Sequence, residues 1–113
     1  MTTNNTHEIS LPTAIDMTTR YRANRPFNFP ICETFGVDAI DKLLATEGCA
    51  FLRVYYGMKA NNEVDAILVA ADAGGEDILP VAASMDLTSD DPVILEDGFR
   101  CPENCPPESP LNS

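Results

Sequence analysis

The chain has 113 residues, of which 44% are apolar, and carries a formal net charge of −11 at pH 7. This length suits one domain and allows a buried core without a structural metal or disulfide. No run approaches the roughly 20 apolar residues that cross a membrane. The first residues form neither a basic nor an apolar segment, so we expect no secretory signal and a cytoplasmic location.

The negative charge lies almost wholly in the second half of the chain. Residues 1 to 60 hold six basic and six acidic side chains, whereas residues 61 to 113 hold twelve acidic side chains and only Arg100 as a base. A polyanionic half repels phosphate backbones, so we expect no nucleic-acid binding. A basic protein surface or cations are more natural partners, and plain solubility is the alternative explanation for the charge.

The N-terminal part predicts an arm followed by a helix. Residues 1 to 9 are polar and show no periodicity, which indicates a flexible arm. Ser10 followed by Leu11 and Pro12 is typical of a helix start, because the hydroxyl caps the first turn and proline lacks only an N–H that would be unpaired anyway. Apolar residues at helical spacing extend this helix to about Ala23.

An extended connection and a second helix should come next. Residues 24 to 32 contain two prolines, which exclude a helix and favour extended backbone, so they form a connector or an edge strand. The second helix is expected to begin between Glu33 and Asp38 and to end at Gly48, a suitable left-handed cap. Its apolar face, Ile40, Leu43 and Leu44, should pack on the strands that follow.

The stretch from Gly48 to Ala71 has the composition of a β-hairpin. Two runs rich in β-branched and aromatic residues flank a polar connection from Met58 to Glu63. In the first run, residues 50, 52, 54 and 56 share a face suited to a core, and the opposite face is mixed. The second run, from Ala66 to Ala71, is apolar on both faces, which indicates a central strand or an interface with a partner.

The remainder of the chain predicts less regular structure. Residues 72 to 77 form a turn, 78 to 81 a short third strand, and 93 to 95 an edge strand or docked tail. We therefore predict an α+β fold in which two N-terminal helices pack on a small, mostly antiparallel sheet. The predicted divisions are a flexible arm at 1–9, a single domain at 10–95 and an irregular, acidic, proline-rich tail at 96–113.

Arg53 interrupts the otherwise apolar first run of the hairpin. If its face is covered, Arg53 must be paired, with Asp65 across the hairpin as the candidate, because an unpaired buried charge is costly. If the face is open, Phe51, Arg53 and Tyr55 form a patch of the kind enriched in protein interfaces. We favour the open face and predict that these three residues bind a protein partner.

The four cysteines allow several arrangements. Cys101 and Cys105 form a Cys-x3-Cys pair, and zinc would need two further ligands from Cys32, Cys49 or His7. The alternatives are a disulfide within the pair, a link from the pair to Cys32 or Cys49, and unpaired thiols. Cys49 begins a strand and is most simply a small core residue. His7 is the only histidine and lies in the arm, so nucleophilic catalysis is not expected.

Three segments together resemble a set of small uncharacterised proteins from Bacteroidota-type bacteria. They are Gly48 to Gly57, the stretch from Ile67 to Asp72 with its glycine turn, and Cys101-Pro102-x-x-Cys105. The resemblance covers roughly residues 10 to 106. It implies a small, bacterial, non-enzymatic protein and no particular substrate.

The chain is also similar in outline to iron–sulfur-carrier-like proteins. Two helices precede Gly48-Cys49, a hairpin and a late cysteine pair. This similarity implies a cluster site formed by Cys49, Cys101 and Cys105. The late pair in that family is Cys-Gly-x-Cys or similar, whereas here it is Cys-Pro-Glu-Asn-Cys, with one residue more and no glycine.

These observations support three hypotheses about function. The leading one is a non-enzymatic interaction or structural accessory protein, without a cofactor, that docks on a larger assembly or self-associates. The second is a metal-binding or iron–sulfur protein that uses Cys49, Cys101 and Cys105. The third is an acidic inhibitor or immunity-type protein that neutralises a basic enzyme.

Overall fold

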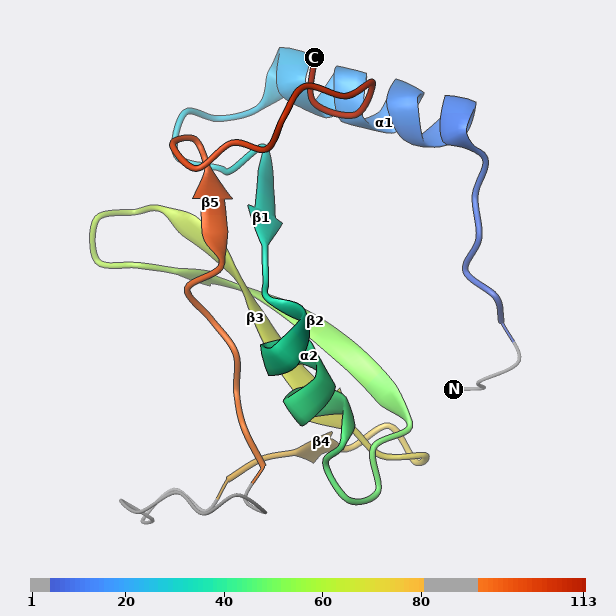
Figure 1. Cartoon of the computed structure of the whole chain (residues 1–113). Coiled ribbons are helices and arrows are strands. Elements are labelled where there is room, and N and C mark those ends of the chain that lie inside the picture. Colours follow the sequence, from blue (N-terminus) through green and yellow to red (C-terminus); the bar gives the residue numbers. More distant parts are fainter. Residues whose placement is uncertain (1–4, 81–91) are drawn as a thin grey trace.

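The computed structural model describes residues 5–80 and 92–113, which contain two helices and five strands (Figure 1). In chain order the elements are α1 (Leu11–Asn24), β1 (Cys32–Thr34), α2 (Val37–Leu44), β2 (Phe51–Met58), β3 (Val64–Ala71), β4 (Asp77–Ile78) and β5 (Phe99–Cys101). The predicted α+β class is confirmed. The predicted turn at 72–77 leads into β4, which starts at Asp77 and ends at Ile78, so the third strand is shorter than the predicted 78–81; residue 81 lies outside the described part.

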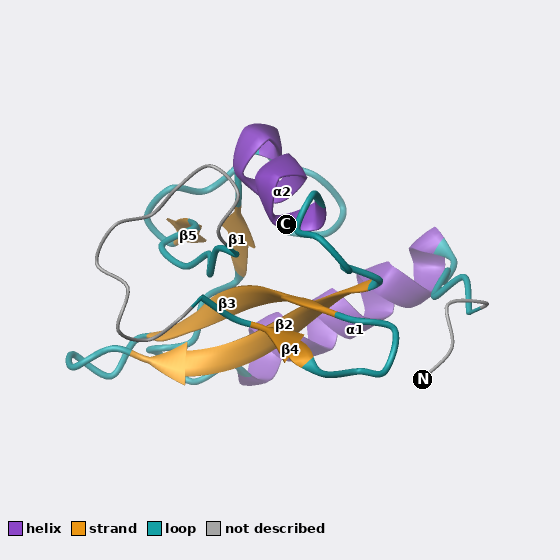
Figure 2. Cartoon of the chain, turned by 90° about the horizontal axis from the view of Figure 1, so that it is seen from below, coloured by secondary structure: helices purple, strands orange, loops and turns teal. Residues whose placement is uncertain are grey.

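The strands form two separate antiparallel sheets. One has the order β2-β3-β4, and the other pairs β1 with β5. The hairpin β2–β3 is the predicted one, with Phe51 opposite Ala71 and Met58 opposite Val64. Viewed along the hairpin sheet, α2 and the β1–β5 pair lie on the same side of it (Figure 2). The fold is therefore a three-stranded sheet with one side covered by a helix and a small second sheet.

α1 begins as predicted, because the Ser10 hydroxyl accepts a hydrogen bond from the Thr13 amide at 3.2 Å. We expected α1 to pack on the sheet, but none of its side chains is buried. Instead it lies beside the C-terminal chain (Figure 1), and Arg22 donates to the carbonyl oxygens of Leu111 and Ser113. The helix has no broad apolar face, so packing on the sheet would bury little apolar surface.

α2 packs on the hairpin, but it is shorter than predicted. It ends at Leu44, and Gly48 adopts its left-handed conformation (φ 84°) in the following turn instead of capping the helix. Leu43 is fully buried against Leu68 and Ala70 of β3, and Ile40 packs on the same cluster. Leu44 points away and is 47% exposed, so its predicted packing is wrong.

The C-terminal segment contains structure that we did not predict. β5 lies within the expected irregular tail, and its residues Phe99, Arg100 and Cys101 pair with Thr34, Glu33 and Cys32 of β1. Before this tail, Leu95 forms a bridge to Leu68 on β3, within the run 93–95 that was expected to be an edge strand or a docked tail. Three paired residues give too short an alternating pattern to be distinguished from a loop in the sequence.

A buried charge cluster joins β5 to the hairpin. The Asp65 carboxylate, 3% exposed, lies 3.3 Å from Arg100 Nε and 3.2 Å from Lys59 Nζ. Arg100 also contacts Glu63 at 3.2 Å and donates to the Asn28 carbonyl oxygen at 2.6 Å. These contacts bring the β2–β3 loop, the β5 strand and the proline-rich connector to one place.

The chain as a whole is spread out. Its Cα radius of gyration is 16.0 Å, compared with about 13 Å for a compact domain of this length. Among the described residues, few large apolar side chains are fully enclosed, and many on α1, β2 and the connector are exposed. No helix in these residues is long and apolar enough to span a membrane.

Adjacent leucines provide a matched test of the core. Leu43→Ala should lower the free energy of unfolding by about 2–5 kcal/mol, because it leaves a cavity in a fully buried site. Leu44→Ala should cost about 1 kcal/mol or less, since that side chain is half exposed. Urea unfolding followed by circular dichroism measures both, and equal losses would contradict the packing described for α2.

The contribution of the charge cluster to stability can be tested by making the same substitution, Asp to Asn, inside the cluster and at an exposed ion pair. Asp65→Asn should lower the free energy of unfolding by up to about 3–5 kcal/mol, because the partly buried Arg100 then keeps only the more exposed Glu63 as a charge partner among the described residues. Asp16→Asn removes an exposed pair with Arg20 and should cost less than about 1 kcal/mol. If denaturant unfolding gives the same stability for both variants, Asp65 does not hold β5 on the hairpin.

Candidate functional site

Two neighbouring features of β2 form the candidate site: its outer face, which carries the predicted patch, and its unpaired edge. Phe51, Arg53 and Tyr55 share the face directed away from α2, as predicted. Arg53 does not pair with Asp65, the partner expected for a covered face. It forms an ion pair with Asp77 of β4. Asp77 is the partner because β4 places it on the same face as Arg53, two strands away. Asp65 instead forms ion pairs with Arg100 and Lys59.

The patch is organised by the Asp77 carboxylate. One oxygen accepts from Arg53 Nη1, and the other accepts from the Tyr55 hydroxyl at 2.5 Å. The hydrogen bond from Tyr55 is the main cause that lowers the pKa of Asp77, and Arg53 lowers it further. The same hydrogen bond raises the pKa of Tyr55. The contacts cross β3 at the level of Val69 and Ala71, which are both buried.

The Leu68–Leu95 bridge, on the side of β3 away from β2, shows which backbone N–H and C=O groups of β2 point away from β3. Leu68 donates to the Leu95 carbonyl oxygen at 2.8 Å and accepts from the Leu95 amide at 3.0 Å. Since the N–H and C=O of one strand residue point to the same side, both groups of Leu68 face away from β2. Its partner Val54 is therefore in a non-hydrogen-bonded pair. The N–H and C=O of Val54 consequently point away from β3.

Alternation extends this result along β2. Leu52, Tyr56 and Met58 have the same orientation as Val54, so their N–H and C=O groups line the outer edge of the strand. In residues 5–80 and 92–113, no other group hydrogen-bonds to this edge, and β2 is the last strand of its sheet on that side. The chain thus presents an eight-residue open edge strand.

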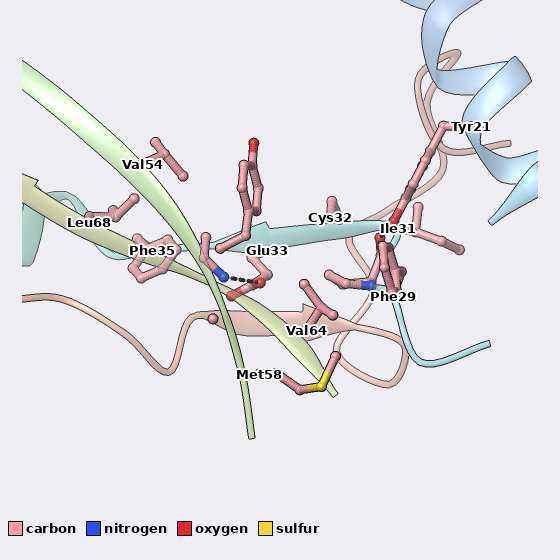
Figure 3. A pocket seen from close by; sticks show the side chains of 14 residues that line it. Tyr21, Phe29, Ile31, Cys32, Glu33, Phe35, Val54, Met58, Val64 and Leu68 are labelled. Atoms are coloured by element: carbon pink, nitrogen blue, oxygen red, sulfur yellow. Dashed lines mark hydrogen bonds between the residues drawn. The ribbon is translucent and has the colours of Figure 1, made fainter. Parts of the chain in front are cut away.

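An apolar groove lies beside this edge on the α2 side of the sheet. Its volume is about 890 Å³. Val54, Tyr56 and Met58 of β2 form one wall, and side chains of β1, β3, α1 and the connector form the rest (Figure 3). Leu52, Val54 and Tyr56 are 44%, 43% and 79% exposed, so the face that the sequence suggested for a core remains largely open.

Glu33 is the one acidic residue of the groove. Its Oε1 accepts the Ala66 amide proton at 2.8 Å, as Figure 3 shows. Its Oε2 is buried and has no hydrogen-bond partner among the described residues. Burial raises the pKa of this carboxyl group. The Tyr21 hydroxyl at the other end donates to the Pro30 carbonyl oxygen at 2.6 Å. The Glu33 carboxylate and the Tyr21 hydroxyl therefore both bind backbone groups, and these hydrogen bonds help to hold the walls of the groove.

The cysteines are not brought together as one ligand set. Cys101 and Cys105 form a disulfide, one of the alternatives left open above, and Cys32 is paired opposite Cys101 across β1–β5. Cys49 is a free thiol packed on the core cluster beside α2. Within the described residues, no group of three His, Cys, Asp or Glu side chains is placed to hold a metal ion. Metal or cluster binding by Cys49, Cys101 and Cys105 stays a prediction.

The open edge was not part of the predicted site. The sequence does contain a signal for it, because β3 is apolar on both faces from Ala66 onward, whereas β2 has one apolar face and one mixed face. A strand that is apolar on both faces belongs in the centre of a sheet, which leaves its partner with the mixed face as the candidate edge. The groove had no such signal, because residues from four stretches far apart in the sequence line it.

Comparison with protein-family models, curated proteins and solved structures finds no match to this chain. The resemblances to Bacteroidota-type proteins and to iron–sulfur carriers therefore remain predictions.

The Asp77 contacts predict a pH dependence. Because its folded-state pKa is lowered, Asp77 contributes stability that is present above its ordinary pKa and is lost as pH falls through the depressed value. The carboxyl ¹³C shift of Asp77, followed by NMR, should titrate below the ordinary value of 3.8. Tyr55→Phe should raise this midpoint, and Tyr56→Phe should leave it unchanged because Tyr56 lies on the opposite face. Equal effects of the two variants would contradict the assignment.

Proposed function

We propose that this protein is a non-enzymatic interaction module that binds an extended protein strand along the open edge of β2. The carrying observation is the row of unpaired backbone groups at Leu52, Val54, Tyr56 and Met58. Such an edge is a template for strand addition, in which main-chain hydrogen bonds supply affinity and side-chain pockets supply specificity.

The composition of β2 supports this proposal. Edge strands that must stay single are usually protected by lysine, proline, a bulge or short length. Phe51 to Met58 has neither lysine nor proline, and all eight residues are in register with β3. Its only charge, Arg53, is matched by Asp77 on the same face. The strand therefore lacks these common protections against pairing.

The groove and the outer patch would contact alternate side chains of an added strand. Residues of an added strand alternate between the two faces of the extended sheet. Those on the α2 side would lie next to Val54, Tyr56 and Met58, and those on the other side next to Phe51, Arg53 and Tyr55. Exposed tyrosine and arginine are favourable contact residues in interfaces. The predicted partner-binding patch becomes one half of the proposed site.

Photo-crosslinking can test whether this edge binds a strand. A photoreactive phenylalanine in place of Tyr56 should crosslink to a partner chain in cells that naturally make the protein, because Tyr56 borders the edge and is 79% exposed. The same group in place of Val37, 72% exposed at the start of α2, should not. Mass spectrometry identifies the adducts, and an adduct to a second copy of this chain counts as a partner.

A second substitution makes the test specific to the edge. Val54→Pro removes an N–H that points away from β3, so it preserves the ladder inside the hairpin and blocks pairing at the edge. It should abolish the adduct at position 56. The proposal fails if the adduct survives Val54→Pro, if positions 37 and 56 give equal adducts, or if no adduct forms.

A further inference from the structure

We infer that the strand bound at this edge is β2 of a second copy, paired antiparallel about a twofold axis that passes through Val54. The inference rests on the function proposed above and names its partner. It would join the two hairpin sheets into one continuous sheet with the order β4-β3-β2-β2-β3-β4. Symmetry, the orientation of the β2 backbone and the side chains that would face each other together select this register.

Symmetry permits few registers for such a pair. Two identical antiparallel strands in one sheet are related by a twofold axis perpendicular to the sheet, so one residue must face its own copy. An axis at Arg53 would place two guanidinium groups opposite each other. An axis at Tyr56 would place Arg53 opposite Lys59 of the second copy. Like charges that face each other destabilise a sheet. Axes nearer either end of β2 would pair only part of the strand with its copy, so the axes at Val54 and Tyr55 are left.

The axis at Val54 gives the better side-chain pairs. Arg53 then faces Tyr55 of the second copy, and Leu52 faces Tyr56, so each exposed tyrosine meets an arginine or aliphatic side chain. Phe51 faces Gly57, and an aromatic ring opposite a glycine in a neighbouring strand compensates for the missing side chain. An axis at Tyr55 would instead place Phe51 opposite Lys59 and Arg53 opposite Gly57.

Gly57 itself has a reason to lack a side chain. A Cβ at this position would lie 2.7 Å from Cδ1 of Ile67 on β3, so a side chain here would have to displace the end of Ile67. Glycine avoids that shift and leaves bare backbone at this point of β2. In the proposed register the Phe51 ring of the second copy covers that point.

The backbone agrees with this register. The N–H and C=O of Val54 point to the open edge, as do those of Leu52 and Tyr56. With the axis at Val54, the Val54–Val54 pair and both Leu52–Tyr56 pairs are hydrogen-bonded pairs that exchange N–H···O bonds. The Arg53–Tyr55 pairs are then non-hydrogen-bonded pairs, in which the side chains lie closest.

Charge also favours a second copy at this place. Each chain carries −11, so most orientations of two copies are repulsive. The stretch 51–58 contributes only Arg53, which is balanced by Asp77, so pairing here adds no unmatched charge.

Charge exchange at the axis tests the register. Val54→Lys and Val54→Glu each place like charges opposite each other in a homodimer, so each variant should self-associate about tenfold more weakly than wild type. Mixing the two variants should restore dimers, now as heterodimers, because opposite charges meet at the axis. With the Val54→Lys variant uniformly ¹⁵N-labelled, native mass spectrometry across a concentration series distinguishes the two homodimers and the heterodimer by mass; the label is needed because lysine and glutamate have nearly the same mass. Val37→Lys adds the same charge away from the edge and should remain dimeric.

Rescue by mixing separates a lost interface from a lost fold, because a misfolded variant is not rescued by another. The inference is overturned if wild type is monomeric at every concentration, if either single variant dimerises like wild type, or if mixing yields no heterodimer. A monomeric wild type that still crosslinks through position 56 to another protein would overturn this inference and leave the proposed function standing. Loss of both dimer and crosslink would overturn both.

Discussion

The arrangement of this protein depends on β3, a strand that is apolar on both faces and therefore needs cover on both. On one face, Leu68 and Ala70 meet Leu43 of α2, and on the other, the Arg53–Asp77–Tyr55 contacts cross above Val69 and Ala71. Its two edges are also occupied, by β2 on one side and by β4 and Leu95 on the other. Because β3 is the central strand, β2 is left at the edge, where no other described residue pairs with it. The candidate site thus follows from the burial of the neighbouring strand.

The buried Asp65 carboxylate extends this arrangement to the C-terminal third of the chain. A carboxylate that is 3% exposed needs compensating charge, which Arg100 of β5 and Lys59 of the hairpin loop supply. Arg100 lies on β5, which is paired with β1, so the ion pair to Asp65 ties the second sheet to the hairpin. Because β1 and the hairpin both line the groove, the same contacts help to hold its two walls together.

The local features of the fold were predictable, and the long-range ones were not. The Ser10 cap, the hairpin and the central position of β3 each follow from patterns within a few residues, and the structure confirms them. The short pairing of β5 with β1 spans nearly 70 positions in the chain and has too few residues for a periodic signal. The partner of Arg53 was missed for the same reason, because Asp77 reaches it through β4, a strand of two residues. Phe51, Arg53 and Tyr55 were correctly placed on one face, since alternation alone decides that.

Pairing of two β2 edges would also explain how association could stop at two copies. An open edge strand invites further addition, and sheets that keep an edge open on both sides risk growing into fibres. Here the opposite end of the sheet is β4, which has only two residues and follows an acidic turn whose Asp72 carboxylate accepts the amides of Gly74 and Glu76. A short edge flanked by carboxylates is a poor template for another strand. The high negative charge, which opposes contact at most surfaces, would thus favour association along β2, whose single charge is balanced.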